Sequence, residues 1–91
     1  MVKESIINHL NKSGKFLIIG KNSYNTARKI TALTSKGCSV FDKVNMLPID
    51  AQRCFYQELC MPSKIVIGTL TKNIELPDVI KKYCMILRLR E

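Results

Sequence analysis

The chain has 91 residues, of which 46% are hydrophobic and 24% charged, and its formal net charge at pH 7 is +8. This length supports one domain with a small core, and the composition excludes an intrinsically disordered chain. No apolar run approaches the ~20 residues that cross a bilayer. The opening stretch MVKESIINHL lacks an apolar signal core, so we expect a cytoplasmic location.

The first half of the chain predicts two helices and two strands. Residues 3–12 form a predicted amphipathic helix, and the apolar run KFLIIG at 15–20 predicts a strand buried on both faces. Residues 24–35 predict a second helix that ends before Gly37, and CSVFD at 38–42 predicts a second strand. The helical residues expected in the core are Ile6, Ile7, Leu10, Ala27, Ile30 and Leu33.

The second half repeats this alternation. The segment 48–60 predicts a helix, because Pro48 suits a first helical turn. The run KIVIGTL at 64–70 predicts a third strand, a short helix follows LPD at 76–78, and CMILRLR at 84–90 predicts a fourth strand. The expected apolar side of the 48–60 helix is Ile49, Ala51, Cys54, Phe55 and Leu59.

Strands that alternate with helices need crossover connections, which build a parallel sheet with helices packed on it. The sequence therefore predicts a single α/β domain over residues 1–91, with four parallel strands and flanking helices.

The cysteines give no metal-binding pattern. No two of them have the C-x-x-C spacing, and the chain has a single histidine, so we expect no metal site. The simplest interpretation is that all four are reduced thiols serving as small core residues: Cys38, Cys54, Cys60 and Cys84.

The positive charge is spread along the chain, with 15 basic residues against 7 acidic ones. Such a balance is typical of a nucleic-acid partner, although it also fits a solvated surface. A candidate basic patch near one end of the sheet comprises Lys21, Arg28, Lys29, Lys36 and Lys43.

A polar turn follows the first predicted strand. In α/β proteins ligands bind at the carboxyl ends of the strands, so this turn is a candidate ligand or partner loop, with an ordinary solvated loop as the alternative. Its residues are Gly20, Lys21, Asn22, Ser23, Tyr24 and Asn25. His9 has no serine or cysteine partner at a catalytic motif spacing, and we expect an ordinary surface residue.

The segment VFDKVNMLPIDAQ at 40–52 raises the possibility of nucleotide chemistry. An apolar run ends in Asp42, as in the metal-binding strand of a nucleotide hydrolase, but Lys43 follows where a carboxylate would polarise water. The alternative is that Asp42 is structural, capping a turn or pairing with a lysine.

Several segments together resemble the AAA+ ATPase core of bacterial enhancer-binding proteins, which activate the alternative, nitrogen-type sigma factor. They are residues 5–20, 26–37, 40–59, 64–75 and 78–89. The resemblance implies a P-loop-NTPase-like three-layer domain with sheet order 4-1-3-2, when strands are numbered along the chain, and a vestigial Walker B site at Asp42 and Lys43.

The departures from that family are extensive. The loop GKNSYNT is too short for a phosphate loop and lacks its Lys-Ser/Thr pair. Thr71 stands in place of the sensor asparagine, while Leu76 and Lys82 stand in place of the two arginine fingers. We also expect no helical lid and no sigma-contacting loop. Because the phosphate loop, the acid after Asp42 and both arginine fingers are missing, we expect no catalysis and no cofactor.

Three functions remain open. The first is a non-catalytic interaction module in transcription regulation, monomeric or dimeric, that contacts another protein such as a regulator or an activator ATPase. The second is a small basic nucleic-acid-binding protein, and the third is a residual nucleotide binder.

Overall fold

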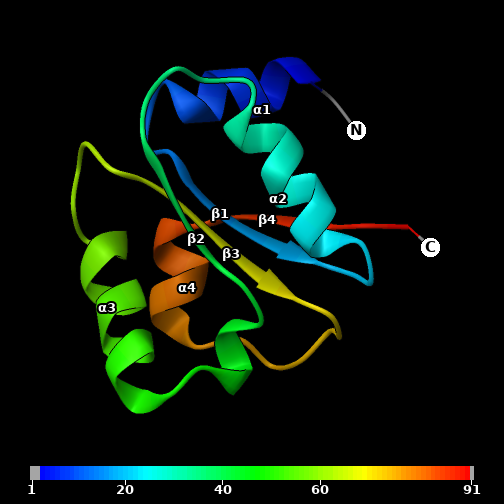
Figure 1. Cartoon of the computed structure of the whole chain (residues 1–91), viewed down its shortest axis with the longest axis vertical. Helices are drawn as coiled ribbons and strands as arrows, with labels where there is room; N and C mark the ends of the chain where they lie inside the picture. The colour runs from blue at the N-terminus through cyan, green and yellow to red at the C-terminus, as the bar shows by residue number, and fades with distance from the viewer. Residues whose placement is uncertain (1–2, 91) are drawn as a thin grey trace.

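Four parallel strands form a sheet with helices on both faces (Figure 1). The computed structural model describes residues 3–90. The strands are β1 (Lys15–Ile19), β2 (Cys38–Phe41), β3 (Ile65–Leu70) and β4 (Met85–Arg88). The helices are α1 (Lys3–Leu10), α2 (Ser23–Thr31), α3 (Ile49–Leu59), α4 (Asp78–Tyr83) and the 3-10 turn η1 (Val44–Met46). The predicted α/β class with a four-stranded parallel sheet and flanking helices is confirmed.

The sheet order is β2-β3-β1-β4, which reads 4-1-3-2 from the β4 edge. The register places Leu17 of β1 opposite Gly68 of β3 and Ile86 of β4. Strands β1 and β3 are therefore central and completely buried, whereas β2 and β4 form the two edges and are partly exposed.

One face of the sheet packs against α3 and α4. Its core joins Leu17 and Ile19 of β1 with Phe55 and Leu59 of α3 and Ile80 of α4. Gly68 of β3 lies on this face, and a Cβ there would lie 2.9 Å from Cζ of Phe55. The ring of Phe55 thus occupies the space that a larger residue at 68 would need.

The opposite face packs against α1 and α2. The alternation of side chains along β1 turns Phe16 and Ile18 to this face, where they contact Ile6 of α1 and Ala27 and Ile30 of α2. Each face therefore has its own apolar cluster, and Figure 1 shows the helices that cover them.

Helix α2 ends at Thr31, four residues before the predicted end at 35. The Thr31 hydroxyl donates to the Arg28 carbonyl at 2.7 Å, and Leu33 N–H donates to the Ile30 carbonyl at 3.0 Å, so the chain tightens and leaves the helix. Leu33 consequently lies beyond the helix and is 38% exposed, which corrects its predicted core position.

Four other predicted core positions were wrong. Ile7 lies on the outer side of α1, and Ile49 is the first residue of α3, where the helix has not yet met the sheet; they are 38% and 67% exposed. Cys54 and Cys60 are exposed, whereas Cys38 and Cys84 are half-buried, and all four thiols are free.

None of the helices in residues 3–90 is both long and apolar enough to cross a membrane.

Candidate functional site

The turn between β1 and α2 carries the predicted ligand loop. Gly20 has φ of 146°, a conformation that favours glycine, and its N–H donates to the Leu70 carbonyl at 2.8 Å. Ser23 N–H donates back to the Gly20 carbonyl at 3.2 Å. These two backbone N–H groups are engaged within the fold, so they are not available to bind a phosphate.

The loop is shorter and less exposed than the sequence indicated. Helix α2 already begins at Ser23, and both Gly20 and Ser23 are buried. The prediction of a polar turn through residue 25 is therefore corrected, because α2 begins at Ser23. The exposed residues of the segment are Lys21, Asn22, Tyr24 and Asn25.

The predicted Walker B pair lies at the carboxyl end of β2, beside Thr69 of β3. The Thr69 hydroxyl donates to Oδ1 of Asp42 at 2.6 Å and accepts from the N–H of Lys43 at 2.9 Å. Lys43 adopts the left-handed conformation with φ of 51°, and Thr69 is fully buried. Asp42 thus has a structural partner, and that partner is a hydroxyl, whereas the sequence suggested that Asp42 caps a turn or pairs with a lysine.

All five residues of the predicted basic patch are exposed, but they do not line one site. Arg28 and Lys36 line a common groove. Lys29 lies on α2 outside that groove, Lys21 precedes α2, and Lys43 follows β2. The structure therefore brings part of the patch together.

The α2–β2 groove is an open depression of about 350 Å³ between helix α2 and edge strand β2. It is lined by Tyr24, Arg28, Thr31, Lys36, Cys38 and Val40. Nη1 of Arg28 donates to the Tyr24 hydroxyl at 3.3 Å, which holds the guanidinium beside an aromatic side chain that is 42% exposed. Two cations beside an exposed aromatic ring can bind phosphates and stack on a base.

A buried lysine was missed by the sequence analysis. Lys15 begins β1, is 3% exposed, and donates through Nζ to the backbone carbonyls of Ser13 (3.1 Å), Met61 (2.7 Å) and Lys64. An ammonium has three donors, so this carbonyl cage satisfies all of them. Burial nevertheless lowers the pKa of Lys15 from its usual value, against the opposing influence of Cys84.

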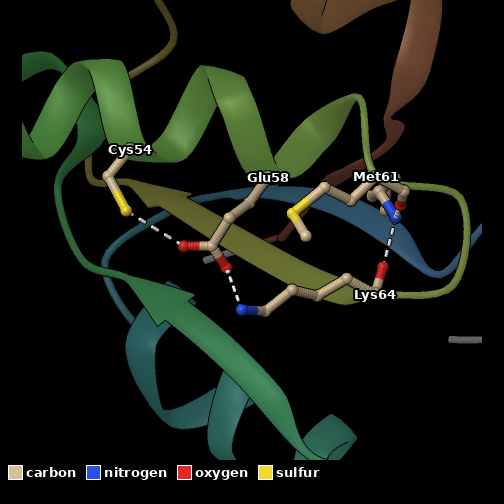
Figure 2. Close-up of polar contacts among 5 residues, drawn as sticks. Cys54, Glu58, Met61 and Lys64 are labelled. Carbon is tan, nitrogen blue, oxygen red and sulfur yellow. Dashed lines mark hydrogen bonds and ion pairs between the residues drawn. The ribbon is translucent and has the colours of Figure 1, made fainter.

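A second polar cluster joins α3 to Lys64, in the segment that leads into β3, as Figure 2 shows. Oε1 of Glu58 lies 2.9 Å from Nζ of Lys64, and the Cys54 thiol donates to Oε2 at 3.1 Å. Burial opposes ionisation of Glu58, but hydrogen bonds from Ser39, Lys64 and Cys54 outweigh it and hold the pKa of Glu58 below its usual value. The bond to Glu58 also raises the pKa of the Cys54 thiol, which makes it a poor nucleophile.

His9 is not an ordinary surface residue. Its Nε2 lies 2.7 Å from the Lys15 carbonyl and 2.9 Å from the Ser13 hydroxyl, and its ring meets Phe16 edge-on at 4.8 Å. With Nε2 protonated, His9 donates to that carbonyl and fixes the turn before β1. The residue is half-buried and structural.

Within residues 3–90, no group of three or more His, Cys, Asp or Glu side chains is placed to hold a metal ion. Comparisons of the chain with known protein families, with curated proteins and with solved structures find no match.

Proposed function

We propose that this chain is a non-catalytic interaction domain with the architecture of a transcription-activator ATPase core, which contacts another protein in transcription regulation. The resemblance of its segments to enhancer-binding proteins supports the transcriptional role. The engaged backbone of Gly20 and Ser23 supports the absence of a phosphate cradle.

The observation that carries the proposal is the bond from Thr69 to Asp42. A nucleotide hydrolase uses this aspartate to hold magnesium and an adjacent acid to polarise water. Here Asp42 accepts a 2.6 Å hydrogen bond from a buried hydroxyl, and Lys43 follows it in the sequence where the adjacent acid would stand. This arrangement disfavours a bound cation, so the domain contributes its surface rather than chemistry.

Affinity purification of the tagged chain from a bacterial lysate tests this proposal. The expected result is stoichiometric recovery of an activator ATPase or of its regulator, identified by mass spectrometry. Recovery of no stable partner at low and moderate salt would contradict the proposal.

The α2–β2 groove favours a second candidate function, binding of nucleic acid. Arg28 and Lys36 line the groove with the exposed ring of Tyr24. The net charge of +8 adds long-range attraction to phosphates.

Fluorescence anisotropy with labelled duplex and single-stranded DNA tests this second candidate. Binding should weaken steeply with salt, and Arg28→Ala and Lys36→Ala should each reduce the slope of log K against log salt by about 1. Tyr24→Ala should weaken single-stranded DNA more than duplex, because stacking needs an unpaired base. Lys72→Ala, an exposed lysine outside the groove, is the control. Equal effects of Arg28→Ala, Lys36→Ala and Lys72→Ala would show that DNA responds to the overall surface charge, and would contradict a binding site in the α2–β2 groove.

A further inference from the structure

Strand β4 forms an open edge of the sheet on the side opposite the α2–β2 groove. Among the described residues it pairs with β1 alone. Leu89 N–H donates to the Ile19 carbonyl at 2.9 Å, which fixes the direction of the backbone groups at this end. Because these groups alternate along a parallel strand, Ile86 and Arg88 present their N–H and C=O to the open edge.

A groove of about 630 Å³ runs beside this edge, between β4 and α1. Its apolar lining includes Ile6, Met85, Leu87 and Leu89, and Arg88 and Arg90 also line it. Both arginines are exposed, and the ion pair found within residues 3–90 joins Lys64 to Glu58 instead. Side chains alternate along β4: Met85 and Leu87 pack in the cluster under α1 and α2, whereas Ile86 packs in the cluster on the opposite face, which is also the face of the Arg88 side chain. The β4 edge thus combines outward main-chain groups with an apolar groove on one face and exposed cationic side chains beside it.

We propose that the β4 edge binds an extended acidic segment of a partner protein, which adds to the sheet as a fifth strand. The outward N–H and C=O groups of Ile86 and Arg88 would pair with the backbone of that segment. Alternate side chains of the segment would enter the apolar groove, while its carboxylates would meet Arg88 and Arg90. This inference deepens the proposed interaction function and rests on it.

Charge complementarity selects this occupant over a second copy of the chain. Edge-to-edge pairing of two copies would bring two sets of Arg88 and Arg90 together, and each copy carries a net charge of +8. Like charges across neighbouring strands are destabilising. Exposed cationic side chains on an edge strand oppose self-pairing, yet they attract an acidic strand.

Nuclear magnetic resonance titration of the full chain with synthetic peptides tests the proposal. The probe is an eight-residue peptide in which glutamate and valine alternate. One matched peptide has lysine in place of glutamate, and another is N-methylated at every second residue, so that it keeps its charge but loses main-chain donors. The protein variants are Arg88→Ala and Arg90→Ala, and Arg53→Ala on α3 is the exposed control.

The acidic peptide should shift the amide signals of Ile86 and Arg88 most strongly. Each arginine variant should weaken its binding about two- to fivefold, as for exposed ion pairs, and Arg53→Ala should not. The lysine and N-methylated peptides should not bind. Equal binding of the lysine peptide, no shifts at millimolar acidic peptide, shifts confined to the α2–β2 groove, or a dimer formed through the β4 edge would each overturn the proposal.

These outcomes separate the inference from the proposed function. Recovery of a regulatory partner whose binding survives both arginine variants would sustain the interaction function and reject the β4 edge as its site. Peptide binding at β4 without recovery of a transcriptional partner would sustain the β4 edge as a binding site and reject the proposed role in transcription regulation.

Discussion

The Thr69 hydroxyl donates a 2.6 Å hydrogen bond to Asp42 and so ties the end of β2 to the centre of the sheet. The same oxygen accepts from Lys43 N–H, which allows the chain to turn in a left-handed conformation. Asp42, for which the sequence suggested a vestigial metal-binding role, holds a strand end in place. Loss of the hydrogen bond between Thr69 and Asp42 should therefore lower the free energy of unfolding.

Thr69→Val keeps the shape of this buried side chain and removes its hydrogen bonds. We expect a loss of about 1–3 kcal/mol in the free energy of unfolding, because the Asp42 carboxylate and the Lys43 N–H both lose a partner. Urea denaturation measures this change. Thr71→Val, at an exposed position, should change stability little and serves as the control; equal effects of the two variants would contradict a structural role for the bond.

Gly68→Ala should destabilise the fold, because the new methyl group would lie within 3.0 Å of Phe55 and Val44 side-chain atoms. Overpacking of this kind costs about 1–3 kcal/mol. Gly37→Ala is the matched control, since nothing lies within 4 Å of a Cβ there, and it should be neutral or slightly stabilising. Thermal unfolding of the two variants checks the difference. A Gly68→Ala variant as stable as the parent would show that Phe55 can move.

Lys15→Met should lower the free energy of unfolding by about 2–4 kcal/mol, because three backbone carbonyls lose a charged donor while the apolar stem is kept. Lys12→Met changes the charge equally at an exposed position and should stay within about 0.5 kcal/mol. Chemical denaturation at neutral pH compares them. A stable Lys15→Met protein would mean that the carbonyls of Met61 and Lys64 find other partners.

Cys84 should make the fold sensitive to alkali. Burial raises the pKa of its thiol from 9.0 to about 12. In the unfolded chain the thiol ionises from about pH 9, whereas in the folded chain it keeps its proton, so its contribution is present below pH 9 and is lost as pH rises toward 12. As pH rises through this window, the free energy of unfolding of the parent should therefore fall relative to that of Cys84→Ser, by up to about 1.4 kcal/mol per pH unit.

Denaturation from pH 8 to 11 measures that difference. A difference that does not change with pH would show that the Cys84 thiol titrates normally in the fold.

Local sequence patterns predicted the elements because each strand is a short apolar run and each helix has an apolar side. They failed where position in the fold decides burial. On α3 the buried residues are Phe55 and Leu59, which are four residues apart and so lie on the same face of the helix. Cys54, one residue before Phe55, lies off this face and is exposed. An apolar segment alone does not reveal which of its residues meets the sheet.

The polar clusters were beyond prediction for a different reason. Lys15 binds carbonyls 46 and 49 residues away, and backbone acceptors leave no trace in the sequence. A structural role was the alternative interpretation of Asp42, but its partner Thr69 lies 27 residues along the chain, on a neighbouring strand. The α2–β2 groove likewise depends on α2 ending at Thr31, which brings Lys36 beside Arg28.

The interaction function is tested most directly by the steady-state rate of ATP hydrolysis of an intact activator ATPase of the enhancer-binding family, measured with increasing amounts of this chain. A basic protein of similar net charge serves as the control. A subunit that lacks the catalytic groups would stall the ring it joins, so we expect a saturable fall in rate that the control does not cause. An unchanged rate at molar excess of the chain, or equal inhibition by the control, would contradict it.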